Sequence, residues 1–160
     1  MGQKQTFVTP LNAVYAYNSS LPLNGAKEPL GTIRMENNAV YKYVQFSGTT
    51  AVALGDAVCY VAFASDGGEV VVDDAHTALG AGIAMSAVAT AGGVQFGWIQ
   101  IKGIASTSQA PSGSPTIGQT LMVSTSTNGQ LALRTALTQQ IVGLYYGSAG
   151  NGVVLCDFPF

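Results

Sequence analysis

Hydrophobic and polar residues alternate along residues 30–46, LGTIRMENNAVYKYVQF. A period of two is typical of β-strands with one buried face. Turn-forming residues at 36–38 interrupt the alternation, so the stretch predicts a β-hairpin with strands at 32–35 and 39–46. In the second strand one face carries Val40, Lys42, Val44 and Phe46, and the other carries Tyr41, Tyr43 and Gln45.

An arrangement of apolar strands and glycine turns then occurs twice, with a period of about 60 residues. Each copy begins with an apolar residue and a glycine, Leu54-Gly55 and Ile117-Gly118, which precede a first strand. Glycine turns separate the later strands of both copies. These are expected at 69–72, 79–85 and 94–102 in the first copy, and at 130–133, 141–146 and 153–158 in the second.

Neither copy is expected to bury a core alone, but together they can close a β-barrel or form a two-sheet sandwich. We therefore predict an all-β fold built from two tandem glycine-punctuated repeats, with an extended N-terminal arm. The arm is expected at residues 1–29 and the β domain at 30–160, with repeat one at 54–103, a Ser-, Pro- and Gly-rich linker at 104–116 and repeat two at 117–158. Residues 13–17 of the arm, AVYAY, can pair as an edge strand.

Other interpretations are possible for the region around residues 73–101. Asp73–Ala89 is the best helix candidate in the chain, but Gly80 and Gly82 disfavour a helix and the repeat assigns a strand there. The length of the segment Ala75–Ile101, which has no Asp, Glu, Lys or Arg, suggests a membrane span. Its Ala, Gly and Thr content argues against one, and the polar start of the chain does not resemble a secretory signal.

The last strand of the first copy is GWIQIKG, Gly97–Gly103, and its outer face carries the single Trp of the chain beside polar residues. Ile99 and Ile101 point to one side and are expected in the core. Trp98, Gln100 and Lys102 share the other side. The matching strand of the second copy, VVLCDF, has no Trp, so the repeat itself does not require one. We therefore expect Trp98 to contact another subunit, and Trp98→Ala to weaken assembly without unfolding the chain.

Charged residues are scarce, at 9% of the 160 residues, and the net charge is −2. Nucleic-acid binding needs clustered Lys and Arg, so the composition argues against a nucleic-acid partner. Between Lys102 and Asp157 the only charged residue is Arg134. Near-neutral surfaces tend to associate. The second half is therefore either an assembly surface or an exterior coated with Thr and Ser.

Few residues of the sequence are candidates for catalysis or metal binding. Asp73, Asp74 and the single histidine His76 could ligate a metal or form an acid–base pair, but no further ligand completes a site, and a polar turn is the simpler interpretation. No nucleophile elbow, phosphate loop or zinc spacing occurs. Cys59 and Cys156 lie in apolar strands and are expected to be buried thiols, with a disulfide as the alternative. We expect neither a cofactor nor a metal.

Aromatic residues on a weakly charged exterior fit a protein interface or a sugar-stacking platform. The alternative is that they plug the ends of the barrel or lie under the N-terminal arm. The candidate assembly interface consists of Trp98, Gln100, Lys102, Tyr41, Tyr43, Tyr145 and Phe160.

Several motifs resemble the capsid decoration (cement) proteins of tailed bacteriophages. They are Tyr41-Lys42-Tyr43-Val44, Gly55-Asp56-Ala57-Val58, and Gly82-Ile83-Ala84 followed by Gly92-Gly93 and Gly103, and the resemblance spans roughly residues 30–158. The second copy departs from the pattern at Gln119, which stands where the first copy has an acid.

The resemblance implies a non-enzymatic virion protein, made in the host cytoplasm and placed on the outside of an icosahedral head. It implies the major capsid protein as a partner, a homotrimer, and stabilisation of the shell against internal DNA pressure. Part of residues 1–30 is then expected to add a strand or clamp onto the shell while the repeats self-associate. A head-fibre, tail or glycan-binding module is the alternative function, and an enzyme using His76 is a third.

Overall fold

The computed structural model describes residues 7, 9–47, 50–63, 69–72, 79–89, 93–147 and 152–158, with the backbone alone described at 61–63 and 69–72. Its strands are β1 (Tyr15–Ala16), β2 (Ile33–Glu36), β3 (Ala39–Phe46), β4 (Ala57–Phe63), β5 (Glu69–Val72), β6 (Gly80–Ala84), β7 (Gln95–Ser106), β8 (Thr120–Val123), β9 (Leu131–Leu133), β10 (Gly143–Tyr145) and β11 (Val153–Asp157). A short 3-10 turn, η1 (Pro22–Gly25), is the one helical element among the described residues. The all-β class predicted from the pattern is confirmed.

The predicted hairpin is present as β2 and β3, which pair antiparallel from Ile33↔Lys42 to Glu36↔Ala39. Asn37 and Asn38 form the turn with φ of 51° and 61°. Asn tolerates this left-handed region better than most residues, and two successive positive φ values match the twist of a two-residue hairpin loop.

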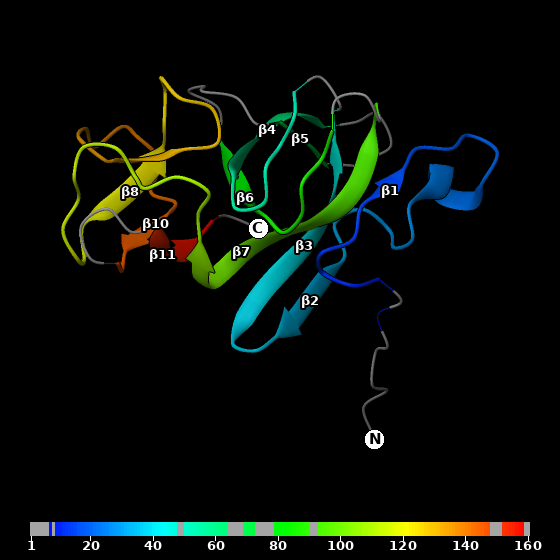
Figure 1. Cartoon of the computed structure of the whole chain (residues 1–160), viewed down its shortest axis with the longest axis horizontal. Helices are drawn as coiled ribbons and strands as arrows, with labels where there is room; N and C mark the ends of the chain where they lie inside the picture. Colours follow the sequence, from blue (N-terminus) through cyan, green and yellow to red (C-terminus); the bar gives the residue numbers. More distant parts are fainter. Residues whose placement is uncertain are drawn as a thin grey trace.

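All the described strands belong to one hydrogen-bonded sheet. In this sheet the strands of the second copy follow in the reverse of the order that their counterparts have in the first copy. The order is β2-β3-β5-β4-β6-β7-β11-β10-β8-β9, with β1 paired to β7. In the first copy β4 pairs with β5 and β6, and β6 with β7. In the second copy β8 pairs with β9 and β10, and β10 with β11. The copies meet at the antiparallel pair β7–β11, and Figure 1 shows β8, β10 and β11 at one end of the molecule and β1 at the other.

The repetition extends to single hydrogen bonds at the start of each copy. The Gly55 amide donates to the Ala84 carbonyl, and the Gly118 amide to the Tyr145 carbonyl, each at 2.9 Å. Both glycines have positive φ, 89° and 86°. The side chain of Asp56 accepts from the Ala53 amide, as that of Gln119 accepts from the Thr116 amide. Gln119 therefore replaces the acid without loss of this turn contact.

The first half of the sheet folds over because β3 pairs not only with β2 but also with β5, in parallel, and with β7, antiparallel. The inward faces of both copies supply one principal core, as expected for repeats that cannot bury enough surface alone. Its largest fully buried members include Phe46, Val58, Ile99, Ile101, Leu121, Leu131, Tyr145 and Phe158. The predicted separation of faces on β3 is confirmed for Val44 and Phe46, which lie in this core.

Cys59 and Cys156 are both buried and are not joined to each other. Burial raises the pKa of the Cys156 thiol to about 12, so it stays protonated at neutral pH. The expectation of two buried thiols is confirmed, and the alternative of a disulfide is wrong.

The helix candidate at Asp73–Ala89 contains β6 instead, as the repeat predicts, while residues 73–78 lie outside the described part of the chain. No helix among the described residues is long and apolar enough to cross a membrane.

Candidate functional site

Four side chains of the expected assembly surface meet on one face of β3 and β7. Tyr43 pairs with Trp98, and Tyr41 with Gln100, and directly opposed residues place their side chains on the same face. The rings of Tyr43 and Trp98 lie edge to face, with centroids 5.0 Å apart. Both side chains are 0% exposed. The sequence pattern therefore identifies the shared face correctly, but this face lies inside the molecule.

The N-terminal arm covers this face. The indole Nε1 of Trp98 donates to Thr9 Oγ1 at 3.0 Å, a contact that is buried. Phe7 packs edge-on against Trp98, with ring centroids 5.9 Å apart. Arg34 fastens the arm because its Nη1 donates to the Thr9 carbonyl at 2.8 Å and its guanidinium lies 5.2 Å from the Phe7 ring centroid. Further along the arm, β1 pairs with β7 through Tyr15↔Phe96 and Ala16↔Gln95.

The arm and this face together form a second, smaller core. Its buried members are Ala26, Ala39, Tyr41, Tyr43, Phe96 and Trp98, and Phe7, Leu11, Leu30, Met85 and Val94 pack against them. The expected exposed assembly surface of Trp98, Gln100, Tyr41 and Tyr43 is thus corrected. The alternative, in which the aromatic residues lie under the N-terminal arm, describes the structure. The physical reason is that rings on two adjacent strands are costly to leave in water, and the chain supplies its own cover.

Gln100 has a structural role at a bulge in β7. Its Nε2 donates to the carbonyls of Lys102, at 3.1 Å, and Ile104, at 2.9 Å. Between these two residues Gly103 has φ of 95°, and a Cβ there would lie 2.7 Å from the Asn38 carbonyl oxygen. The side chain satisfies carbonyls at the irregular position, as buried polar groups must. The strand continues past this irregularity to Ser106, beyond the predicted end at Lys102, and pairs there with β11.

Lys102 is the member of the expected interface that remains partly exposed. Its Nζ lies 3.1 Å from Asp157 Oδ1, and the two side chains are 39% and 72% exposed. The two residues also pair across β7 and β11, where the repeats meet. An ion pair this exposed contributes about 0–1 kcal/mol, so it adds little to the free energy of unfolding.

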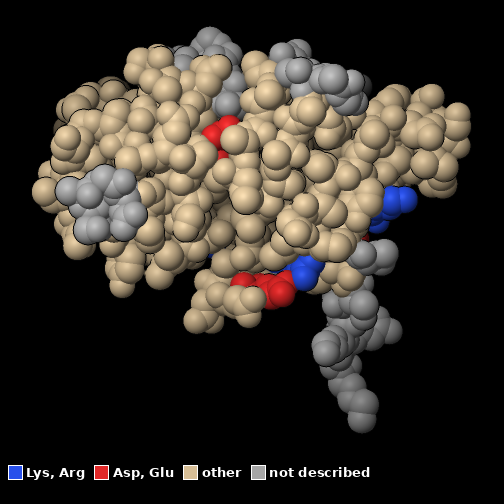
Figure 2. Space-filling view, viewed as in Figure 1, with Lys and Arg blue, Asp and Glu red and all other residues tan. Residues whose placement is uncertain are grey.

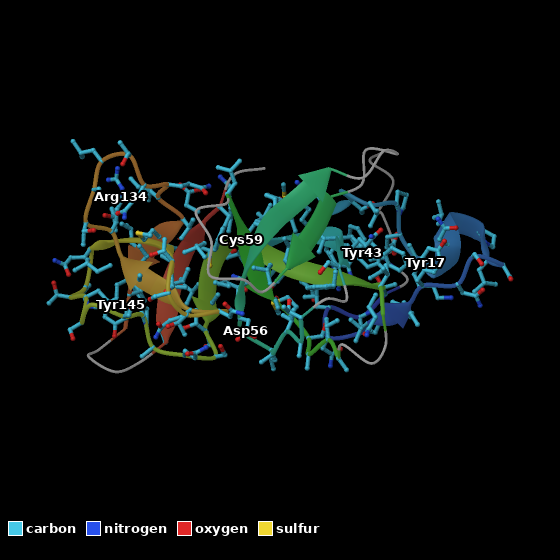
Figure 3. The ribbon with its side chains drawn as sticks, turned by 90° about the horizontal axis from the view of Figure 1, so that it is seen from above. Tyr17, Tyr43, Asp56, Cys59, Arg134 and Tyr145 are labelled. Carbon is cyan, nitrogen blue, oxygen red and sulfur yellow. The ribbon has the colours of Figure 1, made fainter. Side chains whose placement is uncertain are left out.

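Tyr145 lies apart from the other aromatic residues. It is buried in the principal core, and Figure 3 shows it among the strands of the second copy, well away from Tyr43 along the long axis. It therefore does not join Trp98 in a common surface. Phe160, the last residue of the expected interface, lies outside the described residues.

Asp56 joins the first copy to the linker and to the second copy. The side chain is buried and accepts from Ser108 Oγ in the linker. A Cβ on Gly129, which has φ of 70°, would lie 2.7 Å from Asp56 Cγ. Next to it the Ala57 amide donates to the Gly129 carbonyl at 2.8 Å. The sequence marks Asp56 only as a turn residue, because Ser108, its partner in the linker, is 52 positions away.

The burial of Tyr43 predicts a loss of stability at alkaline pH. Burial is the main cause that raises the pKa of Tyr43 to about 12, whereas an exposed tyrosine in the unfolded chain titrates near 10. Below about pH 10 both states keep the proton. Above it the unfolded state loses the proton first, so the stability contributed by Tyr43 falls as the pH rises through about 12.

Urea unfolding of wild type and Tyr43→Phe between pH 7 and 11.5 measures this effect. We expect a constant difference in the free energy of unfolding up to about pH 9.5, and then a shallower decline for Tyr43→Phe than for wild type. Parallel curves over the whole range would show that the Tyr43 hydroxyl is exposed to water in the folded chain.

No group of three or more His, Cys, Asp or Glu that could hold a metal ion occurs among the described residues. Asp73, Asp74 and His76, the candidates from the sequence, lie outside the part of the chain that the structure describes.

Comparisons with known proteins give one informative likeness. No family model matches the chain, and no curated protein sequence matches it. Among solved structures, the fold is similar to the N base of the head fibre protein gp8.5 of bacteriophage phi29. The TM-score is 0.53 at 11% identity, and the match covers 76% of this chain and 94% of that one. At this identity the likeness concerns the fold.

Proposed function

We propose that this chain is a non-enzymatic structural protein of a phage virion, which attaches to the outer surface of an icosahedral head and stabilises contacts between major capsid subunits. The observation that carries the proposal is the likeness in fold to the base of a phage head fibre, over 94% of that chain. The motifs that resemble capsid decoration proteins lead to the same class of protein by an independent route. We further propose that the chain self-associates as a trimer.

The distribution of charge supports a protein partner rather than a nucleic acid. Figure 2 shows one face of the molecule, on which Lys, Arg, Asp and Glu form only small isolated spots. The whole chain has 6 Lys and Arg against 8 Asp and Glu. Phosphate backbones are bound by clustered positive charge, whereas uncharged surfaces lose little hydration free energy when they are buried in a protein contact.

The base of a head fibre is the second candidate, because the similar structure is described as one. Both functions require attachment to the head, but they differ in the effect of attachment on the virion. A cement protein bridges capsid subunits and strengthens the shell, whereas a fibre base carries another structure. A glycan-binding module has less support, since Trp98, its expected stacking platform, is buried.

The position of the arm changes the expected means of attachment. The resemblance leads to the expectation that part of residues 1–30 adds a strand to the shell or clamps onto it. In the structure β1 pairs with β7 of its own chain, and Phe7 and Thr9 cover Trp98. We therefore propose that the β body makes the shell contact and that the described part of the arm stabilises this body.

Sedimentation with heads that lack the protein tests the proposed function. Purified chain mixed with such heads should co-sediment to a saturating level, and it should raise the temperature at which the heads release their DNA. Heads already carrying the protein are the matched control and should take up little more. Saturable binding with an unchanged release temperature would favour the fibre base. Absence of binding would overturn the proposal.

A further inference from the structure

Four apolar side chains lie exposed on the outer face of β7, β11 and β10. Ile104 pairs with Leu155, and Leu155 with Leu144, so the three form one row across the sheet. Tyr146 comes two positions after Leu144, and its amide donates to the Val153 carbonyl at 3.1 Å. The exposed fractions of these four, here called the apolar patch, lie between 36% and 57%. Such a cluster on a sheet face is typical of a contact site.

Two members of the apolar patch have counterparts in the first copy, and these counterparts are buried. Leu144 corresponds to Ile83 and Leu155 to Gln100, because Ile83 pairs with Gln100 as Leu144 pairs with Leu155. Ile83 and Gln100 are both buried. In the second copy Leu144 and Leu155 are 36% and 38% exposed at these same positions.

A second exposed apolar feature is the loop at residues 17–25, here called the tip. Tyr17, Leu21 and Leu23 are 47–57% exposed on it. Leu23 has φ of 52°, in the left-handed region that costs a side chain with a Cβ about 1 kcal/mol. The strained conformation is held in place, since the Asn18 amide donates to the Asn24 carbonyl at 2.7 Å and the Asn24 amide to the Leu21 carbonyl at 3.1 Å. The tip thus presents its leucines in a fixed geometry, which reduces the entropy lost on binding.

The tip and the apolar patch lie at opposite ends of the molecule. Figure 1 places β1, which leads into the tip, at one end and β10 and β11 at the other. The view from above in Figure 3 agrees, with Tyr17 at one end and Tyr145 at the other. Residues 5–26, which contain the tip, have no charged residue. Beside the apolar patch lies the Lys102–Asp157 ion pair, two positions along β7 and β11 from Ile104 and Leu155. A contact between the tip and the apolar patch would bury apolar area and leave this exposed ion pair at its rim.

We infer that the tip of one copy binds the apolar patch of a second copy, so that the chain assembles head to tail. A dimer made by a symmetric contact of tip with tip, or of patch with patch, would leave the other surface exposed in both copies. A head-to-tail contact buries both, and it closes into a ring when the rotation between neighbours permits. This inference rests on the self-association in the proposed function. Its test uses purified protein without heads, so its failure leaves head binding untouched.

Mixing two variants that each lack one surface tests the inference. By size-exclusion chromatography with light scattering, wild type is expected as a closed oligomer, and Leu23→Asp and Leu155→Asp are each expected as monomers. An equimolar mixture should form dimers only, because the intact tip of one variant binds the intact patch of the other. Met35→Asp is the matched control, since Met35 is 76% exposed on β2, and it should keep the wild-type mass.

Leu23→Gly separates loss of contact from loss of fold. Glycine adopts positive φ without strain, so this variant should be at least as stable as wild type while it associates at least about tenfold more weakly. Three results would overturn the inference: wild type that is monomeric at about 100 µM, single variants that keep the wild-type mass, or a mixture of the two Asp variants that stays monomeric although both are folded.

Discussion

Trp98→Ala is expected to lower the free energy of unfolding by about 3–5 kcal/mol, the range for removal of a large buried aromatic side chain. Trp98 is 0% exposed and fills the second core between Tyr43, 5.0 Å away, and Phe7, 5.9 Å away. The substitution removes these contacts, leaves a cavity and deprives Thr9 of its hydrogen bond. A loss of this size is a large part of the free energy of unfolding of a whole domain, which is typically roughly 5–15 kcal/mol. Urea unfolding followed by circular dichroism measures it.

Two variants separate the contributions to this loss. Trp98→Phe keeps most of the apolar volume but removes the indole donor, and should lose about 1–2 kcal/mol. Thr9→Val removes the acceptor, leaves the buried indole N–H unpaired and should lose about 1–3 kcal/mol. If Trp98→Ala were as stable as wild type but failed to assemble, the indole would face a partner and the arm would not cover it.

Gly143→Ala is expected to lower the free energy of unfolding by about 3 kcal/mol, the upper part of the usual range for overpacking. A Cβ on Gly143 would overlap the Leu155 carbonyl oxygen on the adjacent strand β11. Backbone cannot move aside as the end of a side chain can, so β10 and β11 must separate locally. Gly82 occupies the corresponding place in the first copy, where a Cβ would lie 2.8 Å from the Gln100 carbonyl oxygen. Gly82→Ala is therefore expected to be destabilising as well.

Gly118→Ala is the matched control for these glycines. A Cβ there meets nothing within 4 Å, but φ is +86°. It should lose only about 1 kcal/mol, from backbone strain alone. Equal losses for Gly143→Ala and Gly118→Ala in thermal or urea unfolding would show that close strand contact is not what requires glycine at 143.

The repeating pattern predicts most of the fold because its signals are local. The alternation around Tyr41 and Tyr43 indicates the hairpin and its two faces, and the glycine turns indicate the strands of both copies. The copies even share the hydrogen bonds of Gly55 and Gly118. Strand ends are harder to predict, since β7 continues through Gly103 although this glycine has φ of 95°. Whether a strand bends or stops at a glycine depends on its neighbours, here on Gln100 and the Asn38 carbonyl.

The candidate site is harder to predict because its cover comes from a distant segment. Trp98 bonds to Thr9, 89 positions earlier, and the arm has no periodicity to indicate which face it covers. The absence of Trp from the second copy suggests a partner for Trp98. The structure gives a different reason for the asymmetry, since the arm covers the outer face of the first copy. In the second copy the apolar residues Leu144 and Leu155 are partly exposed.

The most direct test of the central claim is a cryo-electron microscopy difference map between heads saturated with this protein and heads that lack it. We predict added density at regular positions on the outer surface of the shell, into which the 11-stranded fold fits with β8–β11 resolved. Absence of added density outside the shell, or density confined to the tail, would contradict attachment to the head exterior.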